Sequence, residues 1–341
     1  MKKQDPKNAG RDRPMIHNLR AIAASALFSL AGMAIPAGSV AQSPYPDRPI
    51  KVVSPFVAGS VSDTALRFLA DSLAAKSGIQ MILQNQPGAG GITAAMSVKS
   101  SPADGYTVAL FSNATAISVS LFRTLPFDTL ADFKPVSGVS DFSYVLMVPG
   151  NSKYSSMQEL LADARARPGA LNIGTAAVGT TPHLAGELLK STLGINVTTV
   201  PFRGSGDLAL AVSRGDVDFI IDTFAPLQAF LVDGKVRALA VTSAERAKML
   251  PSVPTLQESG IAGFEVSSWN GLYVPNGVPP EHILRLRTAV DSALNDPQLQ
   301  GKFEGLGASI QSSPPEKLDA RMRSDIDKWG KVIAATGIER Q

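Results

Sequence analysis

The spacing of apolar residues predicts alternating strands and helices along most of this 341-residue chain, from residue 49 onward. Short apolar runs, typical of buried strands, alternate with longer segments in which apolar residues recur every three or four positions, as on one face of a helix. We expect strands over residues 50–55, 81–83, 106–111, 144–148, 171–174, 197–200, 218–221, 238–241 and 264–273. We expect helices over residues 64–76, 92–99, 157–166, 182–193, 208–214, 226–232, 280–294, 297–306 and 315–335. This alternation is typical of α/β proteins with largely parallel sheets.

Two such blocks, separated by a polar loop over residues 125–141, predict two lobes. We expect the chain to cross between them in the extended runs at 141–144 and 264–269. The last helices then return to the first lobe. Lobe 1 is therefore predicted to comprise residues 42–142 plus 265–341, and lobe 2 residues 143–264. Two α/β lobes joined by two crossings describe a Venus-flytrap receptor, which holds its ligand in the cleft between the lobes.

Residues 1–41 have the layout of a secretory signal peptide, in which a basic stretch precedes an apolar run. Ser39 and Ala41 place small side chains at the two positions that a signal peptidase recognises. The apolar run contains Ser and Gly and is followed by Pro36, so it is too short and broken for a stable membrane span, and a retained anchor is the alternative. We expect cleavage after Ala41 and export to the periplasm, with Met15 as an alternative start.

The net charge of the chain depends on whether this leader is included. The whole chain carries a formal net charge of +3. Six basic and two acidic residues give the leader +4, so the remainder carries −1. No surface for nucleic acid is therefore expected. With 44% hydrophobic and 18% charged residues, the composition is typical of a globular protein.

Residue types that support catalysis and metal binding are scarce. The chain has no cysteine, which excludes lipoprotein attachment, disulfides and thiolate metal sites. Only His183 and His282 lie outside the leader, too few for a zinc site. No G-x-S-x-G motif of a hydrolase and no D-x-D-x-D-G calcium loop occur, although cation sites made of carboxylates alone stay open. We expect neither enzymatic activity nor a cofactor.

Residues 85–91 (NQPGAGG) look at first like a nucleotide-binding loop. The G-x-G-x-x-G pattern would need glycine at Thr93, and no Lys-Ser or Lys-Thr pair follows for a P-loop. We interpret this segment as a tight turn that packs a helix close to the sheet.

The first candidate binding segment is residues 55–63 (PFVAGSVSD), at the end of the first strand. Ser60 and Asp63 have the spacing of a capping box, which predicts a structural role for Asp63. A turn at Gly59 also leaves backbone N–H groups unpaired at a helix N-terminus. Such a terminus carries about half a positive charge and attracts carboxylates. The two roles are compatible.

A second strand-to-helix turn, residues 174–183 (GTAAVGTTPH), belongs to the other lobe. Thr181 fits an N-cap with Pro182 at the first helical position, and capping alone is one interpretation. The other is that two helix N-termini face one cleft and clamp an anion, although phosphate would fit as well as a carboxylate. The helix dipole disfavours an imidazolium at His183, so we expect a neutral ring that packs or accepts a hydrogen bond.

Two charged residues follow strands of the second lobe. Asp222 ends an apolar strand, where α/β sheets bind ligands. It either pairs with an ammonium or amide group of the ligand or caps the helix that follows. Arg203 either clamps the ligand or ties strands together. An aromatic content of 6%, with two tryptophans, argues against sugar-stacking platforms.

At these motifs the chain resembles the Bug family, the TctC-like periplasmic receptors of tripartite tricarboxylate transporters. The matching segments keep their order over nearly the whole mature chain, and the set is specific although no single segment is decisive. They are YPDRPI (45–50), PFVAGSVSD (55–63), NQPGAGG (85–91), PADGYT (102–107), PFD (126–128), TTPHLAGE (180–187), VPFRG (200–204), LAVT (239–242), VPTLQESG (253–260) and WNG (269–271).

The resemblance implies a type II periplasmic-binding-protein fold with two lobes, two crossover strands and a small, usually carboxylate-bearing ligand in the cleft. It also implies that backbone amides, hydroxyls and bound waters of the two turns meet the carboxylate. The residues so implied are Phe56, Gly59, Ser60 and Asp63 in lobe 1 and Thr175, Gly179, Thr180 and Thr181 in lobe 2. Ser60 and Ala177 stand where the family usually has glycine. Both substitutions change the expected pocket shape, so the identity of the ligand does not follow from that of a relative.

We therefore expect a monomeric solute receptor that delivers an organic acid, an amino acid or a related amide to the membrane permease subunits of a tripartite transporter. A second hypothesis in the same fold is an adapter that presents its ligand to a sensor kinase. A third, a periplasmic hydrolase, is disfavoured by the scarcity of histidine and the absence of cysteine.

Overall fold

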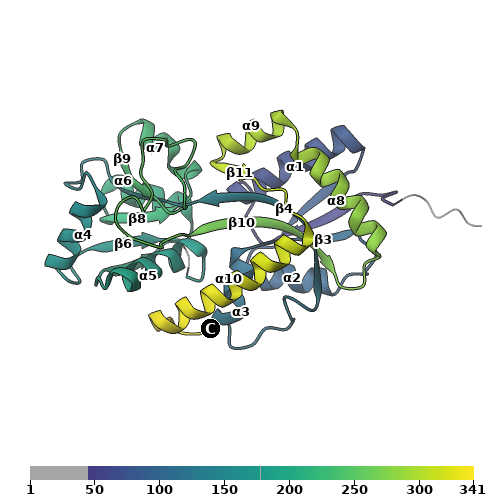
Figure 1. The fold of residues 1–341 in the computed structure, drawn as a ribbon, viewed down its shortest axis with the longest axis horizontal. Coiled ribbons are helices and arrows are strands. Elements are labelled where there is room, and N and C mark those ends of the chain that lie inside the picture. The colour runs from purple at the N-terminus through teal and green to yellow at the C-terminus, as the bar shows by residue number, and fades with distance from the viewer. Residues whose placement is uncertain (1–44, 177) are drawn as a thin grey trace, which may run out of the picture. The chain divides into compact units, whose positions relative to one another are not determined.

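The computed structural model of the protein describes residues 45–176 and 178–341, which contain two β-sheets and the helices that cover them (Figure 1). The predicted signal peptide, its cleavage site and Ala177 lie outside the described residues. No helix within these two ranges is both long enough and apolar enough to cross a membrane.

The first sheet has six strands in the order β11-β4-β10-β3-β1-β2. Strands β2, β1 and β3 are parallel, whereas β10, β4 and β11 join them in antiparallel pairs, so the sheet is mixed and not largely parallel as expected. The strands are β1 (Ile50–Ser54), β2 (Met81–Asn85), β3 (Thr107–Ser112), β4 (Phe133–Ser143), β10 (Ser267–Pro275) and β11 (Ala308–Ile310).

Successive residues of these strands enter two different cores, because side chains alternate between the faces of a sheet. Val52 packs with one group of helices and Val53 with the other. The first group is α1 (Val61–Ser77), α8 (Pro280–Leu294) and α9 (Pro297–Gly305). The second is α2 (Ile92–Lys99), α3 (Asn113–Leu121) and α10 (Pro315–Thr336). Both faces are covered, which explains why the central strands β1 and β3 are nearly continuous apolar runs.

The second sheet has five strands in the order β7-β6-β8-β5-β9, again with a parallel part (β7, β6, β8) and an antiparallel part. The strands are β5 (Val145–Pro149), β6 (Asn172–Thr175), β7 (Thr198–Pro201), β8 (Phe219–Asp222) and β9 (Val236–Val241). Helices α4 (Met157–Ala166) and α5 (Thr181–Leu193) pack on one face. The other face carries α6 (Ser205–Arg214), the short turn η2 (Ala225–Leu227) and α7 (Gln228–Val232).

The chain passes from the first sheet to the second between β4 and β5 and returns between β9 and β10. Strands β4 and β10 pair side by side and run from the first sheet toward the second (Figure 1). Helix α10 is tied to both: Arg321 Nη1 lies 2.6 Å from Asp141 Oδ1, and the Trp269 indole donates to Asp325 at 2.6 Å. The fold is thus the two-lobed α/β fold with two crossover strands that was expected.

Two elements differ from the sequence expectation. Residues 133–143 form the long strand β4 instead of part of a loop, because the polar residues that suggested a loop are buried and paired, as where the Ser140 hydroxyl donates to Asn270 Oδ1 at 3.2 Å. Helix α3 was not expected at all, since its sequence is rich in Ser, Thr and Asn, which are weak helix formers.

Candidate functional site

A cavity of about 640 Å³ is lined by the turns that follow β1 and β3 in the first lobe and β6, β7 and β8 in the second. These strands belong to the parallel part of each sheet, so their carboxyl ends lie at one edge. The carboxyl ends of parallel strands are where α/β sheets bind ligands, because the turns there lead into helix N-termini. The cavity is therefore the candidate binding site.

Four helices present their N-termini to this cavity, two from each lobe. They are α1 at Ser60–Ser62, α3 at Ser112, α5 at Thr180–Pro182 and α6 at 204–206. The first and third were expected. Helix α3 was not expected, and α6 begins at Ser205, three residues before the helix expected over 208–214, so neither N-terminus was predicted to belong to the site. Each terminus offers backbone N–H groups that the helix itself does not pair.

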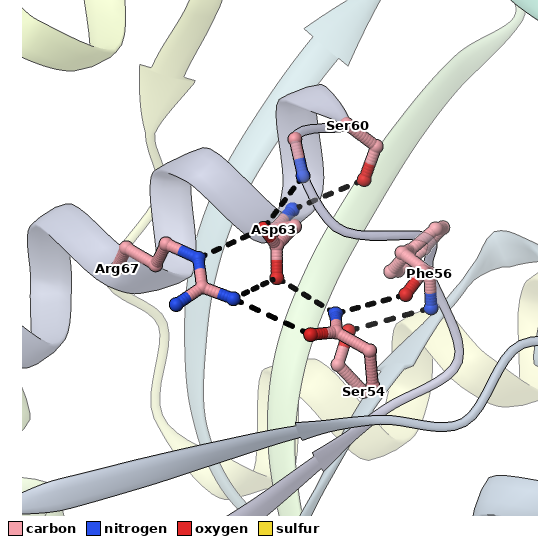
Figure 2. Close-up of polar contacts among 7 residues, drawn as sticks. Ser54, Phe56, Ser60, Asp63 and Arg67 are labelled. Carbon is pink, nitrogen blue, oxygen red and sulfur yellow. Dashed lines mark hydrogen bonds and ion pairs between the residues drawn. The ribbon is translucent and has the colours of Figure 1, made fainter.

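The turn before α1 is held by side chains that lie behind it (Figure 2). Gly59 has φ +81°, a conformation that favours glycine, and Ser60 is the N-cap, whose hydroxyl accepts the Asp63 N–H at 3.3 Å. This is one half of the expected capping box. The other half is shifted by one residue, because Asp63 Oδ2 accepts the N–H of Gly59 at 2.8 Å instead of that of Ser60.

Asp63 is fully buried, and both of its oxygens are used. Arg67 Nε donates to Oδ2 at 2.9 Å, and Asn85 Nδ2 donates to Oδ1 at 2.7 Å and to the Phe56 carbonyl at 2.9 Å (Figure 2). Burial raises the pKa of Asp63, but the bonds from Arg67, Asn85 and the Gly59 N–H outweigh it, so the pKa lies below its ordinary value. Asp63 does not line the cavity. Its carboxylate shapes the turn whose other residues do.

The turn before α5 is built differently. Thr180 is the N-cap, one residue before the expected Thr181, which places Pro182 at the second helical position, where a missing N–H is still harmless. Thr180 makes no side-chain cap hydrogen bond. His183 Nδ1 accepts the N–H of Gly179 at 3.4 Å, and burial lowers the pKa of His183, which agrees with the expected neutral ring.

Gly179 marks a close approach between the lobes. Its φ is +83°, and a Cβ built there would lie 2.5 Å from Leu121 Cδ2, at the end of α3 in the first lobe. A larger residue at this position would therefore require the Leu121 side chain, or the lobe that carries it, to move.

The cavity wall is almost uncharged. Among residues 45–176 and 178–341, Asp222 is the only charged residue that lines it, and no lysine, arginine or histidine does so. In residues 45–176 and 178–341, no group of three or more histidine, aspartate or glutamate side chains is placed to hold a metal ion. An anion in this cavity would therefore meet hydroxyls and backbone N–H groups in place of a cationic side chain.

Asp222, at the end of β8, is 2% exposed. Its Oδ1 accepts the Thr223 N–H at 2.7 Å, whereas its Oδ2 has no hydrogen-bond partner in the described part of the chain. Burial raises the pKa of Asp222 to about 6, although the hydroxyl of Ser205 and the N–H and hydroxyl of Thr223 lower it in part. The alternative role as a helix cap is not observed: Phe224 is the N-cap of η2, and no side chain caps it.

Tyr144 directly precedes Val145, which pairs with Asp222 across β5 and β8, and Tyr144 and Asp222 line the same cavity. Tyr144 is buried. Burial raises the pKa of the Tyr144 hydroxyl, an effect that the hydroxyls of Ser268 and Thr181 reduce and Asp222 increases. The phenol therefore stays protonated and is a hydrogen-bond donor. Sequence reasoning missed Tyr144 because it lies in the crossing between the lobes, a segment that was expected to connect the lobes and not to contact a ligand.

A neighbouring cavity of about 470 Å³ shares Phe56 and Thr180 with the first and extends to Gly179 and Arg203. The glycine-rich segment 85–91 lies along it and makes the expected tight turn, in which the Gly91 N–H donates to the Gly88 carbonyl at 2.9 Å. Arg203 is exposed and ties no strands together, since it makes no hydrogen bond or ion pair to the described residues.

The predicted site residues fall into four groups. Those that line the main cavity are Phe56, Gly59, Ser60, Thr180, Thr181 and Asp222. Gly179 lines the neighbouring cavity, and Asp63 and Thr175 are buried outside the main cavity wall. Ala177 lies outside the described residues. The lining residues that the sequence did not indicate include Ser112, Tyr144, Ser205 and Ser268.

Two α/β lobes, two crossover strands and a cavity at the strand ends define a solute receptor of the type II periplasmic-binding-protein class. Residues 65–338 match the family described as the tripartite tricarboxylate transporter family receptor. The chain belongs to this family, as the sequence motifs predicted. Its members are solute-binding receptors, which favours the transport hypothesis over a sensor adapter or a hydrolase.

Several relatives are similar over most of their length. Protein BugT of Bordetella pertussis is 32% identical, over 93% of this chain and 98% of that one. The structure of R. palustris Rpa4515 with adipate is 32% identical, with a TM-score of 0.79 over 86% of this chain and 99% of the other. MatC from Rhodopseudomonas palustris with bound malate is 30% identical, with a TM-score of 0.75 over 85% and 100%.

Proposed function

We propose that this receptor captures a small carboxylic acid in the cavity between its lobes and delivers it to the membrane permease subunits of a tripartite tricarboxylate transporter. One observation carries the proposal. Four helix N-termini, two from each lobe, surround a cavity that no cationic side chain lines in the described part of the chain.

Such a cavity suits a carboxylate for electrostatic reasons. Each helix N-terminus carries about half a positive charge, and an anion there gains roughly 0.3–1 kcal/mol at exposed sites and up to about 2 kcal/mol where it is partly buried. The hydroxyls of Ser60, Ser112 and Thr181 surround the cavity beside the backbone N–H groups. We assign the carboxylate to the turns before α1 and α5, with Asp63 and Thr175 supporting those turns from behind.

The ligand class follows from the relatives and from the space available. Rpa4515 was solved with adipate and MatC with malate. A volume of about 640 Å³ lies within the range of ordinary small-molecule sites. We therefore propose an aliphatic acid of about that size, with amino acids and their amides included. Turnover of the ligand is not part of the proposal.

The lobes are proposed to be residues 42–142 plus 265–341 and residues 143–264, as the sequence suggested. A ligand held by turns of both lobes stabilises the arrangement in which those turns are close together. The bound form is then the one that the permease subunits recognise. Small-angle scattering should report a smaller radius of gyration with ligand than without it.

Export completes the proposal. Residues 1–41 would direct the chain to the periplasm and be removed after Ala41, leaving a monomer that begins at Gln42. N-terminal sequencing of the protein from the periplasmic fraction tests this, and an uncleaved leader there would contradict it.

The test of function is calorimetric. Small molecules released by denaturing the purified protein are identified by mass spectrometry, and the acid found is titrated against its methyl ester. Loss of one hydrogen bond to a charged group weakens binding about 10- to 100-fold, so the ester at the recognised carboxylate should bind that much more weakly. Equal affinities would overturn the carboxylate proposal.

A further inference from the structure

The two oxygens of Asp222 have different surroundings. Oδ1 accepts the Thr223 N–H at 2.7 Å, and the Thr223 hydroxyl lies 3.4 Å from the same oxygen. Oδ2 is buried and has no partner in residues 45–176 and 178–341. Buried carboxylate oxygens are ordinarily paired, so an unpaired one beside a ligand cavity indicates a place where the ligand supplies the donor.

No structural role explains the unpaired oxygen. In the described residues Asp222 forms no ion pair, and it does not cap η2 or α7, neither of which has a side-chain cap. Its neighbours along the cavity wall are the hydroxyl-bearing residues Tyr144, Ser205 and Thr223. The unpaired carboxylate oxygen of Asp222 is an acceptor, whereas the carboxylate site offers donors. This difference distinguishes the Asp222 end of the cavity from the carboxylate site.

We propose that Asp222 recognises an O–H or N–H donor that the ligand carries in addition to its carboxylate, so that the receptor selects hydroxy acids or amino acids over plain carboxylic acids. This inference rests on the proposed function, since it assumes that an acid occupies the cavity. It adds a specificity-determining residue on the second lobe and narrows the ligand class.

The selectivity has a simple physical origin. A hydroxyl or an ammonium group pairs with Oδ2, whereas a plain methylene leaves it buried and unpaired. A second carboxylate of the ligand placed there would put two acceptors, or two negative charges, side by side. The donor-bearing acid should therefore bind about 10- to 100-fold more tightly than the plain acid of the same chain length.

The experiment uses matched acids in three series, with the purified full-length mature protein and isothermal titration calorimetry. The series are propionate, lactate and alanine; succinate, malate and aspartate; and adipate, 2-hydroxyadipate and 2-aminoadipate. Within a series the members differ only at one carbon, so the comparison isolates the donor. The hydroxy and amino members separate the two kinds of donor.

Asp222→Asn replaces the unpaired acceptor with an amide donor while keeping the shape of the side chain. It should remove the preference for donor-bearing acids. Asp216→Asn, in the exposed turn that leads to β8, makes the same change of charge outside the main cavity and is the matched control. Its preference should equal that of the wild type. Thermal unfolding of both variants shows whether they are folded, and the wild-type panel tests the inference even if one is not.

The outcomes distinguish a failure of this inference from a failure of the proposed function. A donor preference of at least about tenfold in the wild type, lost in Asp222→Asn and kept in Asp216→Asn, supports the inference. Acids that bind without such a preference, or a preference that persists in Asp222→Asn, overturn it and leave the proposed function standing. If no acid of any series binds, the proposed function fails and the inference fails with it.

Discussion

Two buried carboxylates lie close to the binding cavity, one in each lobe, and their surroundings are opposite. Asp63 in α1 accepts hydrogen bonds from Gly59, Arg67 and Asn85, and its pKa lies below the ordinary value. Asp222 at the end of β8 keeps one oxygen unpaired, and burial raises its pKa to about 6. Asp63 does not line the cavity, whereas Asp222 does.

The difference shows how equal burial serves two purposes. The Asp63 bonds are complete without a ligand, so this carboxylate stabilises the turn and holds its N–H groups in place before a ligand arrives. The Asp222 bonds are incomplete, so the folded protein without ligand bears a cost that a suitable ligand relieves. The unpaired oxygen of Asp222, in a residue that lines the cavity, is therefore the observation on which the proposed ligand contact rests.

Asp63→Ala should give the largest effect. It leaves the Gly59 N–H without its acceptor, removes one of the two acceptors of Asn85 Nδ2 and removes the ion-pair partner of Arg67, which is half exposed. The free energy of unfolding should fall by about 2–3 kcal/mol, and ligand affinity should fall because the turn is no longer held. Denaturant unfolding and calorimetry measure the two effects. Asp71→Ala, an exposed acid of the same helix, should change neither by more than about 0.5 kcal/mol.

Asp222→Asn should have the opposite sign in the protein without ligand. The native pKa of Asp222 is raised, so between about pH 4 and 6 the native state binds more protons than the unfolded state, and this group destabilises the protein as pH rises through that window. At pH 8 the variant should be more stable than the wild type by about 3 kcal/mol. Thermal unfolding against pH checks this.

The advantage of Asp222→Asn should disappear as the pH falls from about 6 to 4. Asp63 has the opposite pH dependence. Its pKa is lowered, so its stabilising contribution is present above about pH 4 and is lost only as the pH falls below that value. A variant at Asp222 that is less stable than the wild type at pH 8 would show that the unpaired oxygen is not costly.

Gly179→Ala tests the turn of the second lobe, which relies on backbone shape. The new Cβ would lie 2.5 Å from Leu121 Cδ2 and should push the lobes apart, which should weaken ligand binding about tenfold. Gly194→Ala, at the other end of α5, has a similar positive φ of +61° and nothing within 4 Å. Both variants should lose about 1 kcal/mol of stability, and only the first should lose affinity. Equal affinities would mean that the two lobes need not approach at Gly179.

Ser60→Ala should give the smallest effect. It removes an N-cap bond of 3.3 Å, as does Ser156→Ala at the start of α4, remote from the cavity. Each should lose about 1 kcal/mol of stability. Only Ser60→Ala should weaken binding, by about threefold, because backbone N–H groups remain and water replaces the hydroxyl. If the two variants bind the ligand equally well, Ser60 caps the helix and does no more.

The sequence predicted most of the fold because apolar spacing reports burial directly. It failed at β4, where Ser137, Ser140 and Gly138 interrupt the apolar pattern of a central strand. It also failed at α3, whose residues have low intrinsic helix propensity and depend on packing against α10 and β3. Both failures concern elements that tertiary contacts determine and that local sequence does not.

For the site, the sequence indicated the two turns whose motifs are conspicuous and missed the two that are not. Ser60 and Thr180 follow recognisable strand ends, whereas Ser112 and Ser205 open helices that only the folded structure brings to the same cavity. For the same reason, the sequence left two roles possible for Asp222, a helix cap or a ligand contact. Whether a carboxylate at a strand end caps a helix or faces a ligand depends on hydrogen bonds that the sequence does not determine.

The central claim is that helix N-termini of both lobes, and no cationic side chain, hold the carboxylate of the ligand. A crystal structure of the protein with the acid that it releases on denaturation tests this most directly. The account predicts carboxylate oxygens at about 2.7–3.2 Å from backbone N–H groups or hydroxyls of the turns before α1 and α5, directly or through one water. A carboxylate bound instead to Arg203 or to another basic side chain, away from these turns, would contradict it.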